Sequence, residues 1–372
     1  MQLRGEGRPA IAASSLRGGA AIAEIEAEWR RLLERAARPE PFLHPGWIRA
    51  HLEAFEVGAD VRVVVARRGG RLVAVLPLVE EEARWKGFAY RRLRSASGVH
   101  SCRFDLLVEE GEEAEATRVV LDHLLALCWD VLELRDVPVG GAADRLMDHA
   151  RAAGLGVGAW ESMRTPYVIL PTEGGIEAYL EELSAKFRAN LRRRRKKLAA
   201  NARVEFRRWT RAEPEVLESF YRLEAAGWKG RRGTAIAADP RTRAFYDGVA
   251  AWAAREGILS LAALVREGAP VAMHFGLAQG DVTYLPKPAY DERFAACSPG
   301  QLLMEDVLAD CIAREQRVFD FLGPQMDWKM EWTDRVLPHR WWFAHRWTVR
   351  GRALYVARRK LGPWLARLRA RG

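Results

Sequence analysis

The sequence predicts an α/β protein in which two copies of one unit follow each other along the chain. The length of 372 residues exceeds one average domain and suits two. Hydrophobic residues make up 49% of the chain, which is enough for a sizeable core in each unit. The apolar periodicity places helices, a hairpin, a strand, a helix and a strand in the same order in both halves, which indicates a duplication.

The first half is expected to begin with a flexible arm over residues 1–18, because this stretch is rich in Gly, Arg, Ala and Ser. A domain over 19–165 follows, with the hairpin signal Arg-Arg-Gly-Gly at 67–70. Its expected helices span 20–37, 45–55, 114–128 and 142–153, and its expected strands span 61–66, 72–79, 91–94, 104–108, 131–137 and 155–159.

The second half is expected to form a domain over 166–350, followed by a basic helical tail over 351–372. A hairpin signal at 266–269 again joins two strands. The expected helices span 176–199, 213–227, 241–256 and 299–315, and the expected strands span 167–170, 204–209, 258–265, 270–278, 282–287, 318–322 and 339–349.

An anionic partner is indicated by the formal net charge of +10, which comes from 59 basic and 49 acidic residues. A nucleotide, a nucleic acid and a membrane surface all fit this charge. The four cysteines show neither metal-ligand spacing nor a secretory framework, which favours a reducing compartment. No stretch has the apolar length of a signal peptide or a membrane span, so we expect a cytoplasmic protein, with a peripheral position at the inner face of the membrane as an open option.

The stretch Ser298-Pro299-Gly300-Gln301 predicts the start of a long apolar helix. Ser298 fits the N-cap, Pro299 the first helical position, and Gln301 a capping box. Backbone N–H groups at such a start, beside the small Gly300, can hold a phosphate-bearing ligand, although a well-made helix start without a ligand also explains the pattern. The corresponding place in the first half carries acids at 109–113 that would repel a diphosphate, so we expect the second unit to bind the ligand.

A dense run of basic residues lies on one predicted helix that also has an apolar stripe. Repulsion among so many like charges favours an anionic ligand (cofactor phosphates, lipid head groups or RNA) over a purely solvated face. Arg188 and Arg192 share a side and, with Lys186, are our choice for ligand contact. The basic residues are Lys186, Arg188, Arg192, Arg193, Arg194, Arg195, Lys196 and Lys197, and the stripe is Leu183, Phe187, Leu191 and Leu198.

The order of the elements, a three-stranded meander followed by a helix and a strand, resembles the GNAT acyltransferase fold. The second half is more specifically similar to the CelD-type acetyltransferase family, associated with exopolysaccharide and cellulose operons. That family is itself similar to the tandem-GNAT FemAB aminoacyl transferases. The resemblance covers most of residues 40–345. Its motifs are Pro-Phe-Leu-His-Pro-Gly-Trp at 41–47, Ser-Ala-Lys-Phe-Arg-Ala-Asn-Leu-Arg-Arg at 184–193, Gly-Trp-Lys-Gly at 227–230, Gly-Thr-Ala-Ile at 233–236, Tyr-Asp at 290–291, Ser-Pro-Gly-Gln-Leu-Leu at 298–303, Asp-Phe-Leu-Gly at 320–323 and Lys-Met-Glu-Trp at 329–332.

The resemblance implies two tandem GNAT-like units, a degenerate first unit and an acyltransferase in the second. The implied reaction moves an acyl group from acyl-CoA to an amine or hydroxyl of an envelope polysaccharide, a lipid or a small-molecule precursor, and needs no metal. The pyrophosphate would meet Ser298, Gly300 and Gln301 together with the basic helix. A backbone N–H in the strand before Tyr284 would stabilise the oxyanion.

Three residues are candidates for proton transfer in this reaction. Glu224 lies among apolar neighbours on a helix, where a raised pKa would suit a general base, although a surface glutamate fits as well. His274, in the middle of a strand, is either a base or a buried core histidine. Tyr284 either protonates the leaving thiolate or simply packs.

Six further residues are expected to contact substrate. Asp320 would face the cleft at the carboxyl ends of two parallel strands. Lys329 would close over the ligand, and Asp291 either binds substrate or caps its loop. The full set is Trp228, Lys229, Tyr290, Asp291, Asp320 and Lys329.

Two other functions remain open. An aminoacyl-tRNA-dependent transferase of the FemAB type would bind tRNA with the basic helix, and no other nucleic acid is expected. A non-catalytic GNAT-like module of an envelope biosynthesis system would need the fold but not Glu224, His274 and Tyr284. In addition, the tryptophans late in the chain and the basic tail are typical of an interfacial surface, which would suit an anionic membrane.

Overall fold

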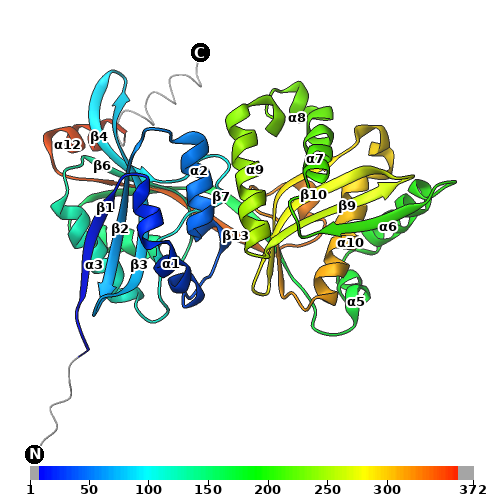
Figure 1. The fold of residues 1–372 in the computed structure, drawn as a ribbon, viewed down its shortest axis with the longest axis horizontal. Coiled ribbons are helices and arrows are strands. Elements are labelled where there is room, and N and C mark those ends of the chain that lie inside the picture. Colours follow the sequence, from blue (N-terminus) through cyan, green and yellow to red (C-terminus); the bar gives the residue numbers. More distant parts are fainter. Residues whose placement is uncertain (1–7, 359–372) are drawn as a thin grey trace, which may run out of the picture. The chain divides into compact units, whose positions relative to one another are not determined.

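The computed structural model describes residues 8–358, apart from the side chain of Trp228. The chain forms two compact units (Figure 1). Unit 1 contains the chain up to Leu52, Glu56–Ser162 and the chain from Pro338 onward, and unit 2 contains Glu53–Phe55 and Met163–Leu337. The chain therefore enters unit 2 within one long strand, β7, and returns to unit 1 within another, β13.

Unit 1 is a mixed sheet in the order β1-β2-β3-β4-β6-β13, with β5 paired to β3. The pairs are antiparallel except for β4 and β6, which run parallel. Buried residues of α3 and α4, such as Val120 and Leu146, pack on one face against alternating strand residues such as Leu76. The elements are β1 (Ile11–Arg17), α1 (Ala20–Glu34), the 3₁₀ helix η1 (Pro41–Leu43), α2 (Pro45–Phe55), β2 (Asp60–Arg68), β3 (Arg71–Trp85), β4 (Phe88–Ser95), β5 (Leu107–Val108), α3 (Glu113–Ala126), β6 (Val131–Pro138), α4 (Ala142–Ala152), β13 (Val336–His345) and α12 (Val349–Val356).

Two features of unit 1 differ from the expectation. Residues 11–17, placed in a flexible arm, form the edge strand β1 antiparallel to β2, and the backbone N–H of Ile11 donates to Glu115. The residues of β13 from Pro338 to His345, expected in the second domain, group with unit 1, where β13 pairs with β6. Both differences come from long-range pairing that local composition does not report.

Unit 2 is also a mixed sheet, with the strand order β7-β12-β11-β10-β9-β8. The hairpin of β9 and β10 and the next strand β11 form an antiparallel meander, and β11 is parallel to β12. The elements are β7 (Gly156–Ile169), α5 (Gly175–Glu182), α6 (Ala185–Leu198), β8 (Val204–Trp209), α7 (Pro214–Ala226), α8 (Trp228–Arg231), η2 (Ile236–Ala238), α9 (Pro240–Arg255), β9 (Leu259–Arg266), β10 (Ala269–Gln279), β11 (Val282–Tyr290), η3 (Glu292–Cys297), α10 (Pro299–Ala313), β12 (Val318–Asp320) and α11 (Asp327–Met330).

Helices cover both faces of the unit 2 sheet (Figure 1). On one face, Phe275 of β10 packs against Phe220 of α7 and Tyr246 of α9. On the other face, α6 and α10 share one core cluster with strand residues such as Ala272 and Leu285. The sheet therefore separates an α7 face from an α10 face, as expected for strands whose successive side chains alternate.

The one helix expected over 176–199 is two helices in the structure. Leu183 leaves the helical conformation and closes α5, and the side chain of Ser184 accepts a hydrogen bond from the backbone N–H of Phe187, 3.2 Å away. Ser184 is thus the N-cap of α6, a role for which serine is well suited.

The parallel ladder between β11 and β12 is short, and this positions the site. It has three residue pairs and ends at Tyr284 opposite Asp320, whereas β11 continues to Tyr290. Just past the ladder, β11 bulges, because Gly276 alone lies opposite two residues, Leu285 and Pro286. A Cβ atom on Gly276 would lie 2.6 Å from the carbonyl oxygen of Ser260, so the sheet admits only glycine there without shifting.

Candidate active site

Tyr284 and Asp320 form the last pair before the two parallel strands separate. In the preceding pair, the Thr283 hydroxyl accepts from the Cys311 thiol of α10 at 3.4 Å. Successive side chains of a strand alternate, so the side chains of Tyr284 and Asp320 project from the opposite, α7 face, although Tyr284 also borders the cavity that Thr283 and Phe319 line. Both side chains are buried. The carboxylate of Asp320 accepts the backbone N–H of Leu322 at 2.8 Å, which turns the chain away from β11.

Lys329 holds the segment that follows β12. Its ammonium group donates to the carbonyl oxygens of Leu322 at 2.5 Å and of Pro324 at 3.0 Å, and its side chain is buried. Leu322 has the uncommon backbone angle φ of 50°, so the turn needs support from outside its own sequence. In this state Lys329, expected to close over a ligand, positions the turn next to Asp320.

Glu224 forms a buried ion pair on the α7 face. One carboxylate oxygen accepts from Lys229 at 2.9 Å, and the other accepts the backbone N–H of Ile236 at 2.8 Å. Lys229 also donates to the carbonyl oxygen of Pro288 in β11, 3.1 Å away. These contacts connect α7, α8 and η2 to the part of β11 that has no partner in β12. Glu224 and Lys229 therefore both have a structural role. Trp228 opens α8, but its side chain lies outside the described part of the chain.

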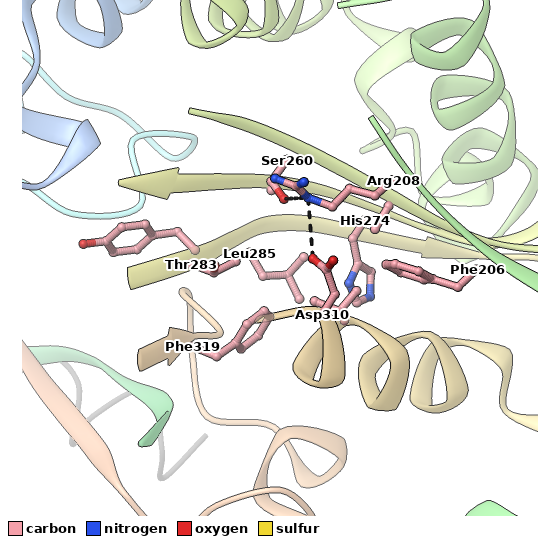
Figure 2. Close-up of a pocket in the computed structure, with 12 residues that line it drawn as sticks. Phe206, Arg208, Ser260, His274, Thr283, Leu285, Asp310 and Phe319 are labelled. Atoms are coloured by element: carbon pink, nitrogen blue, oxygen red, sulfur yellow. Dashed lines mark hydrogen bonds and ion pairs between the residues drawn. The ribbon is translucent and has the colours of Figure 1, made fainter. Parts of the chain in front are cut away.

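His274 lies on the α10 face, separated by the sheet from Glu224. It borders a narrow cavity with room for about one water molecule, and Figure 2 shows its ring beside Phe206 and Asp310. Burial lowers the pKa of His274 to about 3, so the imidazole is neutral at physiological pH. Within the described residues its Nδ1 atom has no hydrogen-bond partner. A group that resists protonation this strongly is a poor general base near neutral pH.

The start of α10 differs in detail from the expected capping box. Pro299 does occupy the first turn and Ser298 the N-cap position, but Ser298 has left-handed angles (φ 45°, ψ 60°) and its side chain makes no capping hydrogen bond. Gln301 is buried and donates to the carbonyl oxygen of Trp328 at 3.2 Å and to Glu331 at 2.6 Å. The capping-box expectation is therefore wrong, because Gln301 has partners in the segment after β12 that satisfy its amide.

The opened part of β11 and the start of α10 meet at Tyr290. A Cβ atom on Gly300 would lie 3.9 Å from Cδ1 of Tyr290, whose ring is partly exposed. Asp291 accepts the backbone N–H of Arg293 at 2.9 Å and pairs with its guanidinium, and this pairing lowers the pKa of Asp291. Asp291 thus caps η3, the second of its two expected roles, and leaves Tyr290 and Gly300 bordering the helix start.

The basic helix α6 divides its charges between structure and solvent. Arg195 pairs with Glu305 and Asp306 of α10 at 2.7 and 2.8 Å. These ion pairs join α6 to α10, and the sequence did not predict them. Arg188 donates to the carbonyl oxygen of Glu181 at the end of α5. The remaining cations of this helix that are exposed are Lys186, Arg192, Arg193, Lys196 and Lys197.

The corresponding helix start in unit 1 is filled by its own side chains. Glu112 is the buried N-cap residue of α3 and pairs with Arg68 at 2.7 Å, and Arg68 also pairs with Glu115 at 2.5 Å. A phosphate there would have to displace two carboxylates from a buried arginine. The exclusion of a diphosphate by the acids at 109–113 stays a prediction, and these ion pairs give it a physical basis.

Sequence reasoning missed the positions that shape this site. The bulge at Leu285 and Pro286 has a weak local signal, a proline inside a strand. The contacts of Gln301 and Arg195 have none, because their partners lie far away along the chain. Among residues 8–358 no group of three or more His, Cys, Asp and Glu side chains could hold a metal ion. In the same range no helix combines the length and apolarity that a bilayer span requires.

Comparison with known proteins identifies the fold of this region. Residues 185–330 match a family model described as an acetyltransferase (GNAT) domain, which confirms the expectation of a GNAT-type acyltransferase domain in the second half. A search of curated protein sequences found no match.

Solved structures with the same fold match nearly the whole chain. FemX is 13% identical with a TM-score of 0.58, covering 88% of this chain and 96% of its own. A conserved protein of unknown function from Bacteroides thetaiotaomicron is 11% identical with a TM-score of 0.56, covering 90% and 100%. The C-terminal domain of a putative lysylphosphatidylglycerol synthetase from Agrobacterium fabrum is 12% identical with a TM-score of 0.51, covering 90% and 97%. These likenesses confirm the predicted α/β fold of two tandem GNAT-like units.

The ion pair of Glu224 and Lys229 supplies a test of their structural role. We expect Glu224→Gln to lower the free energy of unfolding by about 2–4 kcal/mol, because it leaves a largely buried ammonium group without its charge partner. The double variant Glu224→Gln/Lys229→Met should recover part of that loss. Urea unfolding of the full chain measures both, with the exposed Glu215→Gln on the same helix as the control.

Unchanged unfolding of Glu224→Gln, combined with a large loss of turnover, would contradict the structural role and return Glu224 to the candidates for a base.

Proposed function

We propose that unit 2 transfers an acyl group from acyl-CoA to an amine or hydroxyl acceptor. The observation that carries the proposal is the separation of β11 from β12 after Tyr284 and Asp320. Beyond that pair, β11 presents a bulged edge that ends at Tyr290, beside Gly300 at the start of α10. A thioester lying along that edge would have its phosphates at the helix start and its carbonyl at the last strand pair.

The phosphates of the cofactor fit the first turn of α10. Backbone N–H groups at a helix start attract anions, and Gly300 leaves the approach open. Ser298 stands at the same position, and Tyr290 supplies a partly exposed ring for the nucleotide or the pantetheine arm. Lys186 and Arg192 are exposed cations on the neighbouring α6 and would attract the diphosphate. Arg188 and Gln301, in contrast, donate to the backbone carbonyl oxygens of Glu181 and Trp328. We therefore give them the role of positioning the neighbouring segments rather than of contacting the cofactor.

The chemistry is a direct attack of the acceptor on the thioester carbonyl. The acceptor nitrogen or oxygen forms a bond to the carbonyl carbon, the oxygen becomes an oxyanion, and the carbon–sulfur bond then breaks. Residues 282–284 are paired on both edges, with β10 and with β12, so a donor before Tyr284 is already in use. We place the oxyanion instead against backbone N–H groups of the bulged segment 285–287, where Pro286 has none.

Two side chains at the end of the ladder would handle the protons. Asp320 would accept the proton of the attacking amine or hydroxyl, and Tyr284 would donate one to the leaving thiolate. Both project from the α7 face, whereas His274 lies on the other side of the sheet. The acceptor would then approach from the α7 face, past α8 with Trp228 and Lys229.

The proposed class of acceptor rests on the resemblance to the CelD-type family. The motifs shared with the CelD-type family point to an envelope polysaccharide, a lipid or a small-molecule precursor of either. A thermal-shift series with acyl-CoA species of increasing acyl chain length would define the donor. The acyl chain length that raises the melting temperature of the protein most would narrow the choice of acceptor.

A second candidate is transfer of an aminoacyl group from tRNA, favoured by the five exposed cations of α6. Tight tRNA binding that falls steeply with salt, without binding of acyl-CoA, would select this alternative.

A carboxylate at the start of α10 tests the placement of the cofactor. We expect Gly300→Glu to weaken binding of CoA and acetyl-CoA at least tenfold, because it sets a negative charge against the diphosphate. Gly300→Ala should bind nearly normally, since its Cβ makes only an ordinary contact with Tyr290. Isothermal titration calorimetry measures both, with the exposed Ala313→Glu at the far end of α10 as the charge-matched control. Equal affinity of Gly300→Glu and Ala313→Glu would rule the placement out.

The proposed proton transfers predict a matched pair of kinetic effects. We expect Asp320→Asn and Tyr284→Phe each to lower kcat about 10²-fold or more with little change in CoA affinity, because general acid–base groups contribute about that much. His274→Gln should leave the pH profile of kcat/KM unchanged above pH 5, since His274 is neutral there. Full turnover in both Asp320→Asn and Tyr284→Phe would favour a different site, and no turnover in the wild type with any acyl-CoA would favour a non-catalytic module.

A further inference from the structure

Unit 1 carries an exposed apolar surface that the acyltransferase site does not use. Helix α12 buries Leu354 on its inner side and presents Val349, Ala353 and Val356 outward, at spacings of four and three residues. Val349 is 88% exposed and Val356 43%. This apolar stripe of α12 therefore has no partner among residues 8–358.

Aromatic residues extend this face beyond the helix. The distal parts of β3 and β4 pack with α12 in one cluster that includes Tyr90 and Leu354. Trp85 lies opposite Phe88 in the hairpin and shares its side of the sheet with Tyr90, and Phe88 is 42% exposed. Trp347, just before α12, is 54% exposed while its indole N–H donates to the carbonyl oxygen of Gly154. Its polar atom is therefore satisfied, and its ring, which meets the ring of Tyr355 edge-on, keeps about half of its surface in solvent.

Cations surround these apolar groups. Arg350 and Arg352 on α12 and Lys86 at the hairpin tip are exposed, and α12 contains no acidic residue. The rest of the basic tail expected over 351–372, residues 359–372, lies outside the described residues, and its sequence adds five Arg or Lys residues and no Asp or Glu among 14 residues. We call Phe88, Trp347, Val349 and Val356, with Lys86, Arg350 and Arg352, the α12 surface.

We propose that the α12 surface docks onto an anionic phospholipid bilayer. Aromatic rings favour the interfacial zone of a bilayer, aliphatic side chains gain by leaving water, and each Lys or Arg near an anionic surface adds attraction. Exposed valines give nucleic acid nothing to stack on or to hydrogen-bond, so RNA explains the cations of this surface but not its apolar stripe. The proposal is independent of the acyltransferase assignment, because every residue of the α12 surface belongs to unit 1.

Sedimentation of the full chain with vesicles tests the docking. We expect binding to vesicles of 30% phosphatidylglycerol in phosphatidylcholine and at least tenfold weaker binding to pure phosphatidylcholine. Val349→Asp/Val356→Asp should lower the affinity for the anionic vesicles at least tenfold. Val99→Asp should not, since Val99 is 91% exposed on a loop outside the α12 surface. A chain ending at Arg358 should bind several-fold more weakly than the full chain, through loss of the five cations.

Three results would contradict docking of the α12 surface onto a bilayer. Equal sedimentation of the double variant and Val99→Asp, with both folded by circular dichroism, would overturn the proposal. So would equal binding to neutral and anionic vesicles. If the protein ignores vesicles but binds bulk tRNA, and the chain ending at Arg358 loses that binding, the surface is an RNA-binding one and the bilayer proposal is wrong.

Discussion

The arrangement of unit 2 depends on one interruption of a hydrogen-bonded ladder, where β11 and β12 separate after Tyr284 and Asp320. Exposed strand edges are costly unless something satisfies or occupies them. Here the separation is enforced from several directions. The bulge at Leu285 and Pro286 bends β11, Asp320 and Lys329 turn the chain after β12, and Lys229 holds β11 through the carbonyl oxygen of Pro288. In the proposed function, the ligand occupies the edge of β11 that this separation leaves without β12.

The sheet decides which polar residues can act together. Tyr284, Asp320 and the pair of Glu224 and Lys229 lie on the α7 face, whereas His274 lies on the α10 face. Unit 1 has the same order of elements but fills its helix start with Glu112 and Arg68. The two units therefore differ in whether the helix start is filled by an ion pair, and this difference is the physical basis for proposing the activity in unit 2.

Local patterns in the sequence were sufficient for most of the architecture. The hairpin at 266–269, the parallel relation of β11 and β12 and the start of α10 at Pro299 all follow from turn chemistry, spacing and connection rules. Long-range contacts were not accessible in this way. Nothing near Gln301 reveals that its amide binds Trp328 and Glu331, and nothing near residues 11–17 reveals the partner strand β2. The sequence left Glu224 open between a general base and a surface glutamate, and His274 between a base and a core histidine. The structure shows the ion pair of Glu224 with Lys229 and the burial of His274.

Hydrogen–deuterium exchange with and without CoA would test most directly the claim that the separated edge of β11 and the start of α10 form the cofactor site. We expect bound CoA to slow exchange in peptides covering 285–290 and 299–303, because both segments would lie against the ligand. Peptides covering the start of α3 at 111–117 should not change, since Glu112 and Arg68 close that position. Protection at the start of α3, or protection that spares both segments of unit 2 while CoA is bound, would contradict the account.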